Sequence, residues 1–153
     1  MATKPNYPDS PDPNSFESGL EFQDFVAELL LKETGIPLMN YSSRKYQFNI
    51  GENRQGIEIK LDRKMGKNVS IEVAEKSRES RTVWTNSGIF RSDNSWLYIQ
   101  GNYEKVMVFG VTTLRLAYTR HFHDKVWTPK PTIKTFLMPM SYAEMIALKI
   151  FEF

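Results

Sequence analysis

The chain has no cysteine among its 153 residues. This absence excludes disulfide bonds, thiolate metal ligands and cysteine nucleophiles, and it is typical of a cytoplasmic protein. No stretch approaches the roughly 18 consecutive apolar residues that a membrane-spanning helix needs. The segment 1–15 also lacks the apolar centre of a signal peptide. We therefore expect a cytoplasmic protein with no membrane partner.

Familiar phosphate-binding and esterase motifs are missing as well. The sequence contains no GxxxxGK[ST] loop, no GxGxxG loop and no GxSxG turn. The formal net charge is only +2, so the total charge does not indicate a nucleic-acid-binding protein. Any such function has to come from charges that cluster locally.

The chain has enough hydrophobic residues to form one packed core. Hydrophobic residues make up 41% of the chain and aromatic residues 13%, and the length suits a single domain. The segment 1–15 differs, because it is polar and rich in proline. Its prolines are Pro5, Pro8, Pro11 and Pro13. We predict a flexible proline-rich arm over 1–15 and one domain over 16–153.

Apolar periodicity predicts the elements of this domain. A helix is expected to begin near Ser15 or Ser18 and to end at Gly35. Thr112 or Thr113 is expected to begin a second helix, and Ser141 a third that runs to 151. Strands are expected at 45–50, 57–61, 69–76, 96–100, 105–111 and 132–139. The segment 126–131, with its two prolines, is interpreted as a loop.

The order of these elements indicates an α/β fold. The first three strands are expected to form an antiparallel meander. We predict a mixed central sheet of about five to six strands flanked by helices.

Two neighbouring strands carry their charges on one face. Glu58 and Lys60 alternate with isoleucines on the first, and Glu72 and Lys76 occupy the polar face of the second. We expect the two strands to be adjacent, which would bring Glu58 and Glu72 side by side.

Converging carboxylates of this kind have two interpretations. They are tolerated when they are solvated, protonated, paired with lysines or bound to a divalent cation. Mg²⁺ prefers oxygen ligands, and such a cation can polarise a phosphoryl oxygen and activate a water. The alternative is an exposed ladder of Glu/Lys pairs, each stabilising the sheet by about 0.2–1 kcal/mol. Strand spacing alone leaves both interpretations open.

Basic residues lie in the turn between these two strands and after the second strand, and they are candidates for contact with DNA phosphates, although a solvated loop is the simpler interpretation. They are Arg63, Lys64, Lys67, Arg78, Arg81 and Arg91. Trp84 lies in the same region and could stack on bases. Trp96 opens an apolar strand and is expected to lie in the core.

The sequence also resembles a nuclease family. GIEIKLD, a basic turn and VSIEVAEKSR resemble the core of the PD-(D/E)xK nuclease superfamily, which includes many restriction enzymes and the archaeal Holliday-junction resolvases. In that pattern an acid on one strand is followed, one hairpin later, by E-x-K. Glu58 matches the first acid and Glu72 the second. A preceding helix, GLEFQDFVAELL, and a following segment, SGIFRSDNSWLYIQGNYEKVMVFGVTTLRLAY, extend the resemblance over about 19–118.

Two positions depart from the family pattern. Ala74 stands where the lysine of E-x-K is expected. The lysines that could replace it are Lys76 and Lys60. Many members also have a glutamate on the first helix, where this chain has Gln23. The available substitutes are Glu21 and Glu28.

The resemblance implies a Mg²⁺- or Mn²⁺-dependent DNA endonuclease of restriction-endonuclease-like fold, acting on duplex or branched DNA as a homodimer. Glu58 and Glu72 would bind the metal, assisted by Glu21 or Glu28. Lys76 or Lys60 would position the attacking water. The two departures equally fit a non-catalytic nucleic-acid-binding module or a protein-interaction module that keeps the same fold.

Overall fold

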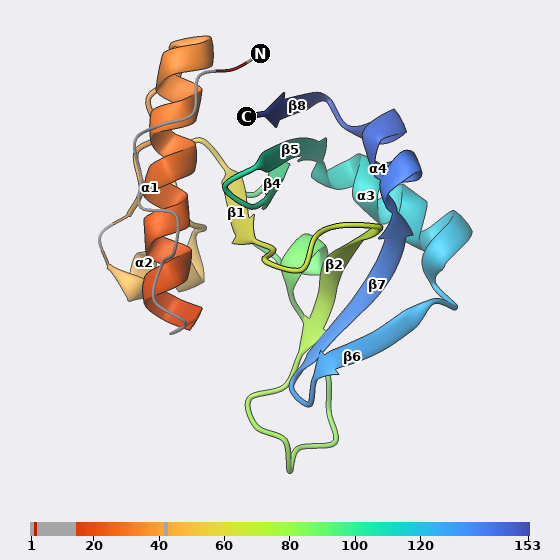
Figure 1. Cartoon of the computed structure of the whole chain (residues 1–153). Coiled ribbons are helices and arrows are strands. Elements are labelled where there is room, and N and C mark those ends of the chain that lie inside the picture. Colours follow the sequence, from red (N-terminus) through yellow and green to blue (C-terminus); the bar gives the residue numbers. More distant parts are fainter. Residues whose placement is uncertain (1, 3–14, 42) are drawn as a thin grey trace.

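The computed structural model describes residues 2, 15–41 and 43–153. Apart from residues 2 and 15, the predicted arm 1–15 lies outside them. The elements, drawn in Figure 1, are α1 Ser15–Thr34, α2 Arg44–Asn49, β1 Ile57–Leu61, β2 Asn68–Glu75, β3 Thr85–Asn86, the 3-10 helix η1 Gly88–Phe90, β4 Leu97–Gly101, β5 Lys105–Gly110, α3 Val111–Ala117, the π-helical turn η2 Tyr118–Phe122, β6 Val126–Lys130, β7 Ile133–Pro139, α4 Met140–Ile146 and β8 Lys149–Glu152.

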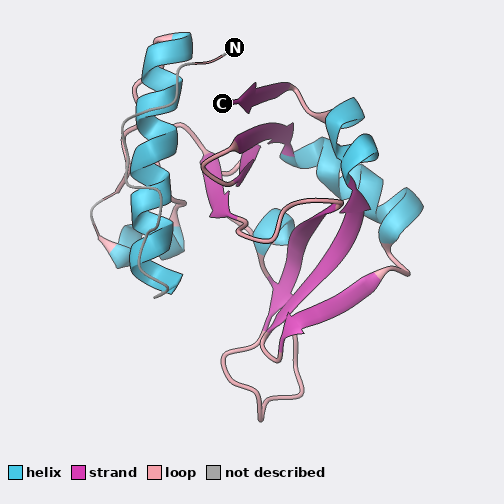
Figure 2. Ribbon diagram, viewed as in Figure 1, coloured by secondary structure: helices cyan, strands magenta, loops and turns pink. Residues whose placement is uncertain are grey.

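The described strands form two sheets of four strands each. The first has the order β1-β4-β5-β8, with β1 parallel to β4 and the other pairs antiparallel. The second has the order β3-β2-β7-β6 and is antiparallel throughout. Figure 2 shows the long strands of the second sheet below the first. The α/β class is confirmed, whereas the expected single sheet of five to six strands is wrong.

The expected pairing of β1 with β2 is also wrong. In β1, Glu58 lies opposite Tyr98 of β4, and in β2, Glu72 lies opposite Thr135 of β7. The reason is that each strand joins the sheet that shares its core: Ile57 and Ile59 pack with α1, while β2 packs in the other cluster. The basic segment between the two strands therefore crosses from one sheet to the other.

Two apolar clusters hold the layers together. On one face of the first sheet, α1 buries Phe22, Phe25, Val26 and Leu29, whose spacing places them on one side of a helix. On the other face, Tyr98, Met107 and Phe109 pack against Val69, Ile71 and Phe136 of the second sheet. Each fully buried side chain of this size stabilises the fold by about 1.5–3 kcal/mol. The first sheet is thus the middle layer.

The segment 45–50, predicted to be a strand, belongs to the short helix α2. Its last turn closes through a hydrogen bond of 2.8 Å from the Ile50 N–H to the Tyr46 carbonyl. The Arg91 guanidinium donates to the Gln47 and Phe48 carbonyls at 2.9 and 2.6 Å. A cation that binds the free carbonyls at a helix C-terminus is favourable, and only the tertiary structure provides it here.

Three further predictions differ from the structure. The predicted loop 126–131 is largely the edge strand β6, where Pro129 is tolerated because no inner ladder needs its N–H. The predicted last helix ends at Ile146, and the chain continues as β8 so that Phe151 can bury in the first cluster. Trp96 is 61% exposed instead of lying in the core, and its indole N–H donates to the Gln55 carbonyl at 2.6 Å.

The structure also gives the start of α3 and the apolar character of the helices. The helix begins at Val111, so Thr112 and Thr113 lie in its first turn. Over the described part of the chain, no helix has the length and apolar character needed to cross a bilayer.

Candidate functional site

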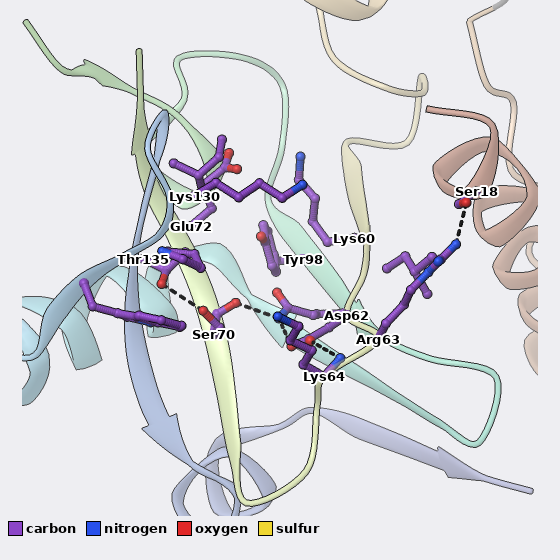
Figure 3. Close-up of a pocket in the computed structure, with 15 residues that line it drawn as sticks. Ser18, Lys60, Asp62, Arg63, Lys64, Ser70, Glu72, Tyr98, Lys130 and Thr135 are labelled. Atoms are coloured by element: carbon purple, nitrogen blue, oxygen red, sulfur yellow. Dashed lines mark hydrogen bonds between the residues drawn. The ribbon is translucent and has the colours of Figure 1, made fainter. Parts of the chain in front are cut away.

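Charged side chains from β1 and β2 meet between the two sheets. The Lys60 ammonium lies 3.0 Å from Oε1 of Glu58, on the face of β1 opposite its isoleucines. The carboxylate of Glu72, on β2, attracts the same ammonium electrostatically and raises its pKa. Although the strands do not pair, the structure therefore brings Glu58 and Glu72 to one lysine. In Figure 3, Lys60 and Glu72 lie at the same end of a cavity.

Glu52, from the turn before β1, is a third carboxylate of this cluster. Its Oε2 accepts a hydrogen bond of 2.9 Å from the Ile59 N–H. Burial raises the pKa of Glu52 from 4.5 to about 8, and repulsion by Glu58 adds to the effect, while Lys60 and Arg91 oppose it. Glu52 was not among the predicted ligands, because it lies between the predicted strands 45–50 and 57–61.

The charges fix the protonation of two further groups. Burial disfavours the Lys60 ammonium, but the Glu58 and Glu72 carboxylates outweigh it and raise the pKa of Lys60 well above its usual value. Burial raises the pKa of Tyr98 well above its usual value; Lys60 opposes the shift and the carboxylates add to it. Lys60 is therefore a cation, and Tyr98 keeps a proton to donate.

Two buried oxygens in the cluster have no hydrogen-bond partner within the described residues: Glu58 Oε2 and Tyr98 Oη. The two residues are only 2% and 1% exposed. An unsatisfied buried oxygen is costly, and most are paired in folded proteins. These atoms therefore mark a place where a bound group would be favourable.

The donor set fits a hard cation only with help from water or substrate. Carboxylate oxygens suit Mg²⁺ or Mn²⁺, and Mg²⁺ is often held by one or two carboxylates together with waters and phosphate oxygens. Glu58, with Glu72 or Glu52, would supply such a pair. Within residues 2, 15–41 and 43–153, no group of three or more His, Cys, Asp or Glu side chains is arranged to hold a metal ion.

A cavity of about 400 Å³ opens beside the cluster (Figure 3). Its basic lining residues are Lys60, Arg63, Lys64 and Lys130. Its polar floor is fixed by the Gln100 amide, which donates to Asp62 Oδ2 at 2.8 Å and to the Ser70 carbonyl at 2.7 Å. The Ser70 hydroxyl donates to Thr135 Oγ1 at 2.8 Å. The lining thus combines fixed polar groups with cations.

A β-bulge in β2 controls which side chains face the site. The register shifts between Glu72 and Ala74, so Val73 and Ala74 both point into the core. Beyond the bulge, Glu75 returns to the face of Glu72, and both line a second hollow with Glu52 and Lys60. The bulge therefore adds a carboxylate to this face.

The predicted lysine Lys76 lies elsewhere. Its ammonium is 4.7 Å from the ring centroid of Trp84, and the Lys134 ammonium is 4.4 Å from the same ring. It also donates to the Glu79 carbonyl at 3.4 Å. Lys60, the other predicted candidate, is the lysine that the fold brings to the carboxylates.

The helix carboxylates that were predicted to assist do not line either hollow at the site. Glu28 pairs with Lys32 at 2.8 Å on the surface of α1, and Glu21 is half-buried outside the lining. Gln23 lines the second hollow with Glu52 and Glu72, as do Gly19 and Leu20 of the same helix. The third carboxylate at the site is therefore Glu52, from the turn before β1, and not a glutamate of α1.

The predicted DNA-contacting residues fall into three groups. Arg63 and Lys64 line the cavity, and Arg63 also donates to Ser18 Oγ of α1. Arg91 lies beneath α2, bound to its carbonyls. The exposed residues outside the cavity are Lys67, Arg78 and Arg81. Lys130, which was not predicted, lines both hollows because its segment is a strand and not a loop.

Comparison with protein-family models, with characterised proteins and with solved structures gives no match for this chain. A buried carboxylate with an unpartnered oxygen, a charged lysine and a basic cavity are suited to binding a phosphodiester and stabilising negative charge that develops on it.

Proposed function

We propose that the chain is a Mg²⁺- or Mn²⁺-dependent DNA endonuclease that hydrolyses phosphodiester bonds. The supporting observation is the buried, unpartnered Oε2 of Glu58 beside Lys60, which itself lines the basic cavity. The proposal includes a restriction-endonuclease-like fold. In its favour, α1, β1, β2, β4, β5 and α3 occur along the chain in the order of the resembling segment, although α2, β3 and η1 lie between them.

Each residue of the cluster would have a distinct role. Glu58 and Glu72 would hold the cation, with Glu52 close to Glu58. The bound cation would polarise the phosphoryl group and lower the pKa of a water. The Lys60 ammonium would pair with a non-bridging phosphate oxygen and stabilise its growing charge. Because nearby carboxylates raise the pKa of Lys60, it stays protonated for this role.

Phosphate groups on either side of the reacting one would contact the basic rim. Arg63, Lys64 and Lys130 surround the cavity, and such contacts position DNA without reading its sequence. The segment 76–84, which carries Arg78 and Arg81, projects away from both sheets in Figure 1 and would reach DNA farther along. A homodimer, which would present two sites to two strands, remains a prediction.

A non-catalytic nucleic-acid-binding module is the second candidate. Two observations favour it. The described residues contain no three-ligand group for a metal, and Lys60 already neutralises Glu58 through an ion pair. Such a module would use the same cavity and basic rim to bind DNA but would not cleave it.

Incubation with plasmid and branched DNA separates the two candidates. With Mn²⁺ the native protein is expected to cleave, and excess EDTA should stop it. Glu58→Gln, Glu72→Gln and Lys60→Met should each lower the cleavage rate by roughly a hundredfold or more, because the first two weaken binding of the cation and the third removes the positive charge beside the reacting phosphate.

The matched control is Glu79→Gln, which changes an exposed glutamate outside the site and should leave the rate unchanged. Equal cleavage by Glu58→Gln and the native protein would exclude the proposed site. DNA binding without cleavage by the native protein would favour the second candidate.

A further inference from the structure

One row of side chains crosses the cavity from the carboxylate cluster to a tryptophan. Glu72 of β2 is paired with Thr135 of β7, and Thr135 is paired with Trp127 of β6. Directly paired residues project from the same face of a sheet, and all three line the cavity. Neighbouring strands lie about 4.8 Å apart, so Trp127 and Glu72 are separated by roughly 10 Å along this row. The cavity therefore has a charged end and an aromatic end.

The aromatic end presents an apolar surface suited to stacking. Trp127 is 44% exposed, and Pro129 and Ile133 also line the cavity. Trp127 has no aromatic or cation–π partner within the described residues. Trp84, in contrast, is already covered by two lysine ammonium groups. A flat ring system could stack on Trp127 without displacing a protein side chain.

The charged end presents donors suited to a phosphate. Lys60 and Lys130 line it. The Tyr98 hydroxyl is buried, has no partner within the described residues, and points toward the end where Lys60 and Glu72 lie (Figure 3). A phenol hydroxyl is a hydrogen-bond donor, so it can donate to an anionic oxygen that enters the cavity. A hydroxyl without a protein partner, together with two lysine ammonium groups, is suited to binding an anion.

We propose that this cavity binds one unstacked nucleotide of a DNA strand. The base stacks on Trp127, and the phosphate lies at Lys60, Lys130 and the Tyr98 hydroxyl. The separation of the two ends is about the reach from a nucleotide's phosphate to its base, and the volume of about 400 Å³ accommodates one such unit.

The inference rests on the proposed nuclease function and specifies its substrate. A base inside a duplex is not accessible to such a cavity without being extruded from the stack. The preferred substrate is therefore single-stranded DNA, a frayed end or a branch point, rather than continuous duplex.

Calorimetric titration with thymidine 5′-monophosphate in EDTA tests the cavity without a metal. The nucleotide should bind at least about tenfold more tightly than thymidine or inorganic phosphate alone, because it fills both ends. Trp127→Ala should weaken binding by about tenfold or more, the size of effect expected for one lost base stack. Trp96→Ala is the matched control, an exposed tryptophan outside the cavity, and should bind as the native protein does.

Tyr98→Phe and Lys130→Gln test the phosphate end. Tyr98→Phe removes only a hydroxyl without a partner, so its melting temperature should equal or exceed that of the native protein, while its affinity falls several-fold. Lys130 is exposed, so Lys130→Gln should fold and should also bind more weakly. Unchanged affinity in Trp127→Ala, or phosphate binding as tight as nucleotide binding, would overturn the inference.

The plasmid assay with Mn²⁺ keeps the two proposals separate. Cleavage without nucleotide affinity would overturn the nucleotide cavity and leave the nuclease standing. Nucleotide affinity without cleavage would support the cavity and remove the proposed catalysis.

Discussion

Glu52 has an unusual environment for a carboxyl group that lies in a turn. It is held by the Ile59 N–H and lies near Glu58, Lys60 and Arg91. Burial is the largest influence and raises its pKa from 4.5 to about 8. A raised carboxyl pKa means that folding favours the protonated form.

This shift predicts a pH-dependent stability. Below about pH 4.5, Glu52 is protonated in the folded and unfolded states. Between about pH 4.5 and 8 only the unfolded state ionises it, so the free energy of unfolding should fall as pH rises through this window. Glu52→Gln should remove this decline and be more stable than the native protein at pH 8.5. Urea unfolding at several pH values measures both effects.

Glu79→Gln, in an exposed loop, is the control and should follow the native profile. If Glu52→Gln runs parallel to the native protein from pH 5 to 8.5, Glu52 is not the group responsible.

Part of the site could be predicted from the alternation of polar and apolar residues in the sequence. Strand alternation correctly places Glu58 and Lys60 on one face of β1, and the structure brings Glu72 to the same place. The choice between Lys60 and Lys76 depends on the bulge and on Trp84, which the sequence pattern does not contain. Tyr98 was not predicted because its importance comes from burial beside Lys60.

At the scale of secondary structure, Gly88 allows η1 to pack closely against β2. It begins η1 with a φ of +54°, in the left-handed region that favours glycine. A Cβ at this position would lie 2.1 Å from the Glu72 carbonyl oxygen. Gly88 thus allows η1 to pack directly against the backbone of a predicted metal ligand.

Gly88→Ala should therefore disturb both stability and the site. We expect a loss of at least about 2 kcal/mol in the free energy of unfolding, since the φ and the contact are both incompatible with alanine. Cleavage or DNA binding should fall further than stability explains, because Glu72 is displaced. Urea unfolding and the plasmid assay measure the two effects.

Gly66→Ala is the matched control. Its φ is not in the left-handed region, and the nearest atom to an added Cβ is 3.9 Å away, so its stability should be close to native. Native-like behaviour of both variants would show that η1 can move without consequence for Glu72.

The positions of the strands along the chain were predicted more accurately than the contacts between elements. Strong apolar alternation or continuous burial identified β1, β2, β4, β5 and β7, because these patterns are local. The failures involve long-range contacts. Arg91, distant in sequence, binds the end of α2, and β6 forms only because β7 provides an edge to pair with. The partition of β1 and β2 between two sheets likewise depends on which core each strand shares.

At the scale of the whole molecule, charge is distributed unevenly despite the small net value of +2. Cations line the cavity, whereas Lys105 on β5, next to the edge strand β8, is bound by Glu144 and Glu152. Burial disfavours its ammonium, but these two hydrogen-bonding carboxylates raise the pKa of Lys105. A polyanion would therefore approach from the cavity side.

DNA affinity should accordingly depend on salt and on cavity lysines. The logarithm of the binding constant should fall linearly with the logarithm of salt concentration, and Lys64→Gln or Lys130→Gln should each reduce the slope by about 1. Lys149→Gln, on β8 at the opposite edge of the first sheet from β1, should not change it. Fluorescence anisotropy with labelled single-stranded DNA measures the slopes. Equal slopes for all variants would place the DNA on another surface.

The bulge in β2 also has a consequence for how this chain should be compared with its relatives in evolution. The extra residue at Val73 is absorbed locally, so its deletion would leave Glu72 and Glu75 on the faces they now occupy. We expect homologous chains to differ in length at this position. An alignment without a gap there would superimpose Glu75 and Lys76 on residues of the opposite face, so a homologous chain has to be aligned with this one by strand register and not by residue count.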